Sequence, residues 1–207
     1  VGDFLQNLFL HVSSRIDNDL SAWYCPWMKI VFDVDNCLVD FTKSFRQFCR
    51  EQFPPHGIDM DESTYGLGMD PDVLHDMIKR WWESPAAARV EFFPGAVDTF
   101  NDLAFRHDVE IVSSFPEEHR QKREANLVPL SFHRGIVLLP GNEKRDYIVK
   151  ANPDIAIEDK PDLIETFALD GITVLFPRWQ PYARAAAERL ASRPVRIHGF
   201  DHWDEVP

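Results

Sequence analysis

The 207-residue sequence has few cysteines, no long apolar run and a shortage of basic residues. Its three cysteines, an odd number, do not suggest a disulfide framework and favour a reducing, cytoplasmic location. No stretch approaches the roughly 18–20 consecutive apolar residues that span a bilayer, so we expect no membrane segment. Lysine and arginine number 22 against 34 acidic residues, and the net charge of −12 argues against a protein that binds duplex nucleic acid through its phosphates.

The residues that are present indicate a folded protein with one main domain. Hydrophobic residues make up 44% of the chain and include 16 phenylalanines and 6 tryptophans, enough to build a substantial core. Residues 1–27 show helical spacing but lack the basic start and long apolar centre of a secretory signal. We interpret them as an amphipathic extension or appendage, and expect the functional domain to begin at Met28.

Short apolar runs alternate with helical patterns from Lys29 onward, which is typical of a parallel sheet flanked by helices. The predicted class is therefore α/β, with a Rossmann-like, three-layer arrangement. The expected strands are the apolar runs at residues 30–32, 109–112, 136–139, 155–157 and 172–176. The spacing also predicts helices over 72–82 and 96–105, and a final helix within 177–191 that is followed by a short tail.

The first two predicted strands are separated by residues 33–108, far more chain than a crossover of about a dozen residues requires. Aromatic and apolar residues at helical spacing, with Asp70-Pro71 as a helix start, predict that a small helical cap is inserted there. We place the cap at 42–91 and the core at 28–41 and 92–207. Pro94-Gly95 marks the return of the chain to the core.

Pairs of polar residues follow three of the predicted strands directly. They are Asp33 with Asp35, Ser113 with Ser114, and Glu158 with Asp159. Ligands of open parallel sheets bind beyond the carboxyl ends of the strands, so these residues should meet at one edge. Converging carboxylates repel one another unless a hard cation such as Mg²⁺ lies between them. Each pair alone is ordinary loop or capping chemistry, but the three together predict a site for metal and phosphate.

The chemistry that such a site suits is the hydrolysis of a phosphate monoester. Attack by the carboxylate of Asp33 would form an aspartyl-phosphate and so divide one difficult displacement into two easier ones. Asp35 would protonate the leaving alkoxide and then deprotonate the attacking water. Ser113 would bind a phosphoryl oxygen, and a lysine would add a compact positive charge.

Residues 29–41, KIVFDVDNCLVDF, resemble motif I of the haloacid dehalogenase superfamily, an apolar run followed by D-x-D. The sequence at 111–114, IVSS, is similar to the second motif, and IAIED at 155–159 is similar to the fourth. The resemblance covers about residues 28–176. It implies a Rossmann-like fold, Mg²⁺ as cofactor and an aspartyl-phosphate route.

The resemblance also implies a role for each matching residue. The metal ligands would be Asp33, Asp35 through its backbone carbonyl, and Asp159, with Glu158 behind them. Ser113 would bind phosphate, with Ser114 as its neighbour. Two positions depart from the usual pattern: Asn36 stands where the superfamily commonly has Gly, and Ser113 stands in place of Thr.

The sequence offers more than one candidate for the phosphate-binding cation of the third motif. Lys144 precedes Asp159 by enough chain for a helix and a strand, whereas Lys150 is almost at the strand already. We therefore assign this role to Lys144 and keep Lys150 and Arg145 as alternatives.

Within the superfamily, three features resemble the 5′(3′)-deoxyribonucleotidases, which remove phosphate from nucleoside monophosphates. They are Asp40-Phe41 after motif I, Trp82-Glu83-Ser84 at the end of the cap, and FFPGAV at 92–97. The resemblance implies that a deoxynucleoside 5′-monophosphate is the substrate. Because aromatic rings stack on bases for about 1–3 kcal/mol each, we expect Phe45 and Trp82 to contact it.

Other functions remain open from the sequence. The protein could be a phosphatase for another small ester such as a sugar phosphate, or a catalytically silent interaction protein that holds Mg²⁺. A metal-independent dehalogenase is disfavoured because it has no use for Asp35. The oligomeric state, a homodimer included, is not fixed. The basic residues Arg120, Lys122 and Arg123 are interpreted as a solvated helix face.

Overall fold

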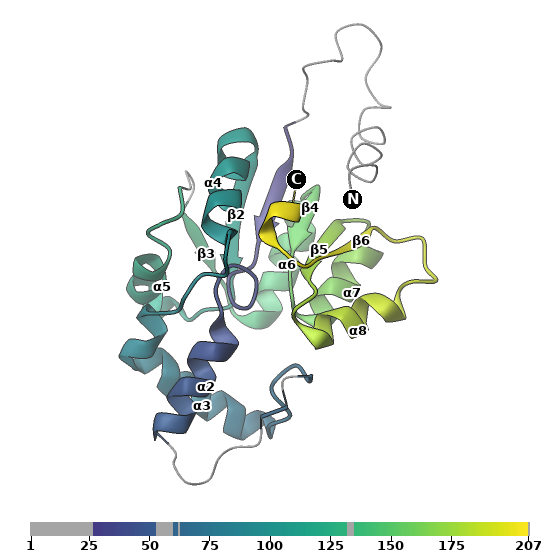
Figure 1. Ribbon diagram of the computed structural model, residues 1–207. Coiled ribbons are helices and arrows are strands. Elements are labelled where there is room, and N and C mark those ends of the chain that lie inside the picture. The colour runs from purple at the N-terminus through teal and green to yellow at the C-terminus, as the bar shows by residue number, and fades with distance from the viewer. Residues whose placement is uncertain (1–26, 53–59, 62, 132–134, 207) are drawn as a thin grey trace, which may run out of the picture.

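A six-stranded parallel sheet forms the centre of the protein (Figure 1). The computed structural model describes residues 27–52, 60–61, 63–131 and 135–206, so the predicted N-terminal extension lies outside the described residues except for Trp27. The strand order is β3-β2-β1-β4-β5-β6. The strands are β1 (Lys29–Phe32), β2 (Asp108–Ser113), β3 (Ile136–Leu138), β4 (Ile155–Ile157), β5 (Thr173–Pro177) and β6 (Ile197–Phe200).

The predicted α/β class is confirmed, and all five predicted strands are present. The sixth strand, β6, lies in the segment that we interpreted as a tail. Its sequence, IHGF, is too short and too mixed to show a strand pattern, and it pairs only with β5 at the edge of the sheet. A larger residue would not fit at position 199 without displacing Arg178, because a Cβ there would lie 2.6 Å from the Nε of Arg178.

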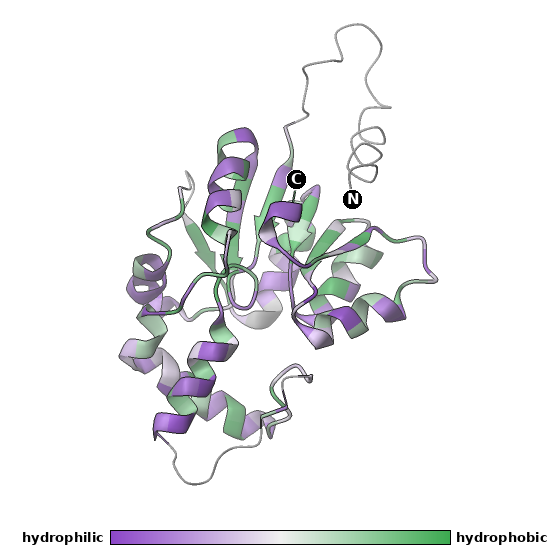
Figure 2. Cartoon of the chain, viewed as in Figure 1, coloured by the Kyte–Doolittle hydropathy of each residue, from purple (hydrophilic) through white to green (hydrophobic). Residues whose placement is uncertain are grey.

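Helices cover both faces of the sheet because alternate strand residues point to opposite sides. In β1, Ile30 and Phe32 belong to one buried cluster and Val31 to the other. The first cluster includes residues of α4 (Ala96–Arg106), and the second includes residues of α6 (Gly141–Ala151), α7 (Pro161–Leu169) and α8 (Pro181–Arg189). Figure 2 shows the strands as mainly hydrophobic and the helices as mixed.

Helix starts follow the expected local chemistry. Both α7 and α8 begin at a proline, which fits the first helical turn because its missing N–H has no partner there in any case. In α3 (Pro71–Glu83), Asp70 caps the helix and its side chain accepts hydrogen bonds from the N–H groups of Asp72 and Val73. The described helices include none with the length and hydropathy of a membrane-crossing segment.

A small lobe lies beyond the carboxyl ends of the strands (Figure 1). It contains α2 (Phe41–Gln52), α3 and the short 3₁₀ helix η1 (Pro85–Ala88). Trp81 of α3 is fully buried, packs edge-on against Phe41 at a centroid distance of 5.0 Å, and donates a hydrogen bond to Ser44. This one indole therefore contacts α2 through both a ring contact and a hydrogen bond.

Lys122 joins the lobe to the core. It lies in α5 (Arg120–Asn126), and its Nζ donates hydrogen bonds to the carbonyl oxygens of Trp82 and Glu83 at 2.5 and 2.8 Å. These carbonyls end α3, where a positive charge interacts favourably with the helix dipole. The interpretation of Arg120, Lys122 and Arg123 as a solvated face is therefore wrong for Lys122, which caps a helix of the lobe.

The packing of α4 predicts very different effects for two identical substitutions on that helix. Phe100 is fully buried and packs against Phe32, whereas Phe105 is 85% exposed. We expect Phe100→Ala to lower the free energy of unfolding by about 3–5 kcal/mol, because it leaves a cavity in the core. Phe105→Ala should change it by less than about 0.5 kcal/mol. Denaturant unfolding of both variants measures this, and similar losses would contradict the assigned face.

Candidate active site

The carboxyl ends of β1 and β4 bring the predicted acidic residues together. The two strands are neighbours, with Phe32 opposite Ile157, and the N–H of Asp33 donates to the carbonyl of Ile157 at 2.9 Å. A cavity of about 190 Å³ lies at this edge. Six predicted site residues from the core line it: Asp33, Asp35, Ser114, Lys144, Glu158 and Asp159.

A buried lysine links two of these carboxylates. The Nζ of Lys144 lies 2.5 Å from Oδ1 of Asp33 and 2.8 Å from Oε2 of Glu158. Burial by itself lowers the pKa of Lys144, but the two carboxylates outweigh it and raise that pKa above its usual value. The alternatives Arg145 and Lys150 are exposed on the same helix. The structure therefore places Lys144, and neither alternative, in the cavity.

The carboxyl group of Asp33 has a pKa well above the ordinary value of an aspartate. Burial raises its pKa to about 7, and the negative charges of Glu158 and Asp35 act in the same direction, while Lys144 opposes them. The pKa of Asp159 is also raised, first by burial and then by the charges of Asp33 and Glu158. Four carboxylates thus meet two cationic side chains, Lys144 and Arg123. This imbalance is what a bound divalent cation would relieve.

The arrangement fits a hard cation. Ligand atoms of Asp33, Cys37 and Asp159 lie within 4.8 Å of one another, and all three residues are buried. Burial raises the pKa of the Cys37 thiol well above its usual value, with the nearby carboxylates adding to the effect. Because a thiol binds metal as thiolate, this leaves the carboxylate oxygens as the available donors. Oxygen ligands suit Mg²⁺, and Asp33 and Asp159 would hold it.

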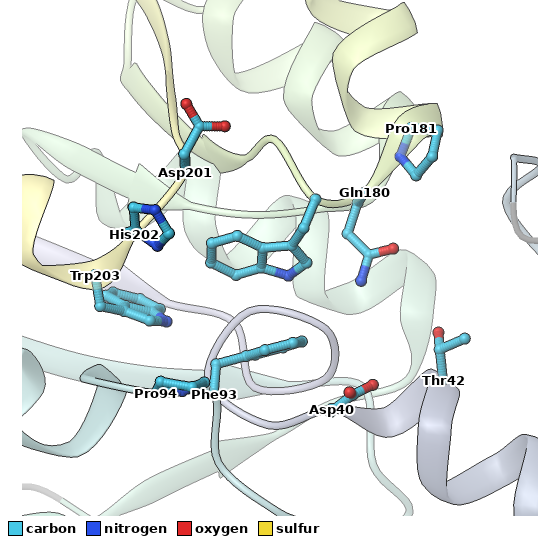
Figure 3. Close-up of a pocket in the computed structure, with 10 residues that line it drawn as sticks. Asp40, Thr42, Phe93, Pro94, Gln180, Pro181, Asp201, His202 and Trp203 are labelled. Carbon is cyan, nitrogen blue, oxygen red and sulfur yellow. The ribbon is translucent and has the colours of Figure 1, made fainter.

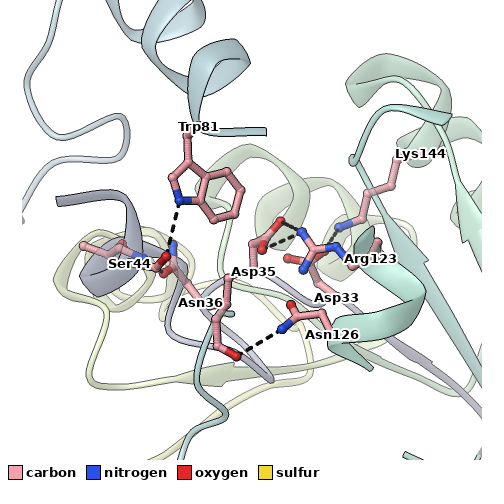
Figure 4. A network of polar contacts seen from close by, with 10 residues as sticks. Asp33, Asp35, Asn36, Ser44, Trp81, Arg123, Asn126 and Lys144 are labelled. Carbon is pink, nitrogen blue, oxygen red and sulfur yellow. Dashed lines mark hydrogen bonds and ion pairs between the residues drawn. The ribbon is translucent and has the colours of Figure 1, made fainter. Parts of the chain in front are cut away.

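Asp35 is held by an arginine that our sequence reasoning placed in solvent. Nη2 of Arg123 lies 2.7 and 2.6 Å from the two carboxylate oxygens of Asp35 (Figure 4). Arg123 is fully buried, and its guanidinium lies 4.2 Å from the ring centroid of Phe115. The solvated interpretation is therefore also wrong for Arg123. A helical arginine looks solvated in sequence, but ion pairing and stacking on an aromatic ring make its burial tolerable.

The two serines after β2 have different surroundings. Ser113 is fully buried at the end of the strand, and its Oγ has no hydrogen-bond partner among the described residues. Ser114 is exposed and lines the cavity. Of the two serines that we predicted for phosphate binding, Ser114 lines the cavity and Ser113 does not. The roles of both residues stay predictions.

The two aromatic residues expected at the substrate also differ. Trp82 lines the cavity. Phe45 is fully buried and stacks on Phe41 at a centroid distance of 5.3 Å, so it belongs to the core of the lobe. One turn earlier on the same face of α2, Phe41 is the residue that lines the cavity. Phe45, which we expected to contact the substrate, therefore does not line the cavity. Phe41 lines it instead.

Sequence reasoning missed Tyr182 and the contacts of Asn36. The hydroxyl of Tyr182 donates to Oδ2 of Asp159 at 2.7 Å, and Nδ2 of Asn36 donates to the Tyr182 oxygen at 3.1 Å. Tyr182 follows β5 within a few residues. The rule that sites lie beyond strand ends also covers the residues after β5, where α8 begins and Tyr182 lies.

A second cavity, of about 440 Å³, lies beside the first (Figure 3). Its walls include Phe93 and Trp179, whose ring centroids are 4.8 Å apart, and Trp203. Thr42 lines both cavities. None of the predicted catalytic, phosphate-binding or metal-binding residues lines the second cavity.

The raised pKa of Asp33 predicts how pH affects stability in the absence of metal. Asp33 has a pKa of about 7 when folded and 3.8 as its ordinary value, so between these values the folded state retains a proton that the unfolded state has lost. The contribution of this group to the free energy of unfolding therefore falls as pH rises through that window. We expect Asp33→Asn, which cannot ionise, to gain stability relative to wild type across it. Denaturant unfolding with a chelator measures this, and a pH-independent difference would contradict it.

Comparisons with known proteins identify the fold. No family model matches the chain, and no curated protein sequence matches it either. Solved structures do. A haloacid dehalogenase-like family hydrolase from Streptococcus pneumoniae has a TM-score of 0.61 at 19% identity, over 87% of this chain and 96% of that one.

Two further structures are similar. A haloacid dehalogenase family hydrolase from Deinococcus radiodurans, with bound phosphate and sodium, has a TM-score of 0.55 at 15% identity, over 88% of this chain and 94% of that one. A proposed phosphoglycolate phosphatase from Lactobacillus plantarum has a TM-score of 0.55 at 14% identity, over 87% of this chain and 97% of that one. The chain therefore has the haloacid dehalogenase-like fold.

Proposed function

We propose that this protein is a Mg²⁺-dependent phosphomonoester hydrolase with Asp33 as its nucleophile. The observation that carries the proposal is the meeting of Asp33 with Asp159 and Lys144 at the carboxyl edge of the sheet. The similarity to a hydrolase structure with bound phosphate agrees with it. A carboxylate beside a cation site and a lysine is the arrangement that covalent phosphoryl transfer needs.

Each residue would have a defined task. Asp33 would form a bond to phosphorus while the ester oxygen leaves, and water would later hydrolyse the aspartyl-phosphate. Lys144 reduces the negative charge that opposes the approach of an anionic phosphate. Protonated Asp35 would give its proton to the leaving oxygen, and the resulting carboxylate, which Arg123 contacts at both oxygens, would take one from the water. A bound Mg²⁺ would neutralise phosphoryl oxygens and favour in-line attack.

The substrate that we propose is a deoxynucleoside 5′-monophosphate. Support comes from the aromatic side chains of the lobe on the cavity wall, Phe41, Tyr65 and Trp82, which offer faces for a base. A second candidate is a smaller ester such as a sugar phosphate. The cavity volume of about 190 Å³ favours it, because sites for larger ligands have about 300–1,000 Å³.

Phosphate release from a panel of substrates tests the proposal. The panel contains the four deoxynucleoside 5′-monophosphates, their ribose counterparts and several sugar phosphates, each with Mg²⁺ and with a chelator. We expect release that depends on Mg²⁺ and that falls at least about 10³-fold in Asp33→Asn, because the nucleophile is lost. Turnover of a sugar phosphate alone would favour the second candidate. A panel that is inert throughout, with a protein that co-purifies at fixed stoichiometry, would support an interaction protein instead.

Lys144 and Lys150 provide a matched pair of substitutions on α6. Lys144→Ala should lower kcat/KM by about 10²–10³-fold, as does the loss of a group that stabilises the transition state. It should also lower the melting temperature, because two buried carboxylates lose their counter-ion. Lys150→Ala removes an exposed lysine and should leave both quantities near wild type. Steady-state kinetics and thermal unfolding measure the two effects, and near-normal turnover by Lys144→Ala would refute its role.

A further inference from the structure

A chain of hydrogen bonds connects Asp159, two residues after β4, with the first turn of α2. We propose that Tyr182 and Asn36 are positioning residues that fix the carboxylate of Asp159 for the cation. The inference rests on the proposed function, because it takes Asp159 to be a metal ligand. It adds two residues to the site that are not metal ligands themselves: Tyr182, which lies outside the motifs, and Asn36, which departs from the usual glycine within motif I.

The first link fixes one oxygen of Asp159. The Tyr182 hydroxyl donates to Oδ2 at 2.7 Å, and both residues are buried. A hydroxyl has one proton to donate, and this one is directed at the carboxylate. With Oδ2 occupied, Oδ1 is the oxygen of Asp159 without a hydrogen bond among the described side chains. Partners behind a ligand orient it in this way in metal sites generally.

The second link fixes the tyrosine. Nδ2 of Asn36 donates to the Tyr182 oxygen at 3.1 Å, so the hydroxyl accepts one hydrogen bond while donating the other. Asn36 is itself held by the start of α2, because its Oδ1 accepts from the backbone N–H and the hydroxyl of Thr42 at 3.0 and 2.9 Å. The amide therefore uses its donor on one side and its acceptor on the other, and its orientation is set by these contacts.

The backbone of Asn36 explains why this side chain can reach both partners. It has a φ of 60°, in the left-handed region that asparagine adopts more readily than most residues. It lies one residue after Asp35, in the tight loop that follows β1. Glycine would fit the same backbone without strain but would provide neither hydrogen bond. The asparagine therefore adds contacts that the turn alone does not require.

The packing around Tyr182 keeps the ring in place independently of its hydroxyl. Its ring lies against that of Tyr65 at a centroid distance of 5.5 Å, and the residue is part of the second buried cluster. Tyr182→Phe retains this ring and removes only the hydroxyl. The substitution therefore separates the hydrogen bond from the packing.

Calorimetric titration with Mg²⁺ tests the proposal on the full chain. We expect Tyr182→Phe to raise the dissociation constant for Mg²⁺ about 10–100-fold, as the loss of such supporting contacts does elsewhere. Asn36→Gly should raise it in the same direction by a smaller factor. Tyr147→Phe is the matched control, because it removes a hydroxyl that donates to Glu110 at 2.7 Å away from the cavity, and its affinity should equal that of wild type.

Thermal unfolding of the same variants separates positioning from general stability. A purely structural role would lower the melting temperature of Tyr182→Phe and leave its Mg²⁺ affinity unchanged, which would overturn the proposal. If Tyr182→Phe does not fold, unchanged affinity in Asn36→Gly overturns it equally.

Asp159→Asn distinguishes the two proposals. If wild type binds Mg²⁺, Asp159→Asn does not, and Tyr182→Phe binds as wild type does, the positioning role is wrong and the proposed metal site stands. If wild type fails to bind Mg²⁺, or Asp159→Asn binds it normally, both the metal role of Asp159 and the positioning role are wrong.

Discussion

The buried contact of Lys144 with Asp33 and Glu158 is the constraint on which the site depends. Two carboxylates at the ends of adjacent strands would repel each other strongly away from water, and one ammonium group within 2.8 Å of both makes their proximity tolerable. The compensation is partial, since burial and neighbouring charge still raise the pKa of Asp33 and Asp159. The negative charge that remains would favour a bound cation at this edge of the sheet.

The surroundings of this contact follow from the parallel sheet. All strand carboxyl ends face the same side, so loops from β1, β2, β4 and β5 converge there, and the lobe formed by α2 and α3 covers them (Figure 1). The core supplies charge and the lobe supplies aromatic surface. Under the proposed function, this division would separate the residues that carry out the chemistry from those that select the ester.

The sequence was sufficient to predict features with a local pattern. The apolar runs gave five strands, and the acids after β1 and β4 met as expected because adjacent parallel strands end together. Contacts between distant residues were not accessible in this way. Asn36 and Tyr182 are 146 positions apart, and nothing near Arg123 indicates that it pairs with Asp35, 88 positions away. Phe41 and Phe45 lie on one helix face, and the sequence pattern does not show that Phe41 is the one that lines the cavity.

The short helix α5 connects two parts of the molecule through consecutive residues. Lys122 holds the carbonyl oxygens that end α3, and Arg123 holds both oxygens of Asp35. Any displacement of the lobe must therefore either break the lysine contacts or carry α5 with it. In the second case Arg123 moves too, and the carboxylate of Asp35 that it contacts would change direction with the lobe.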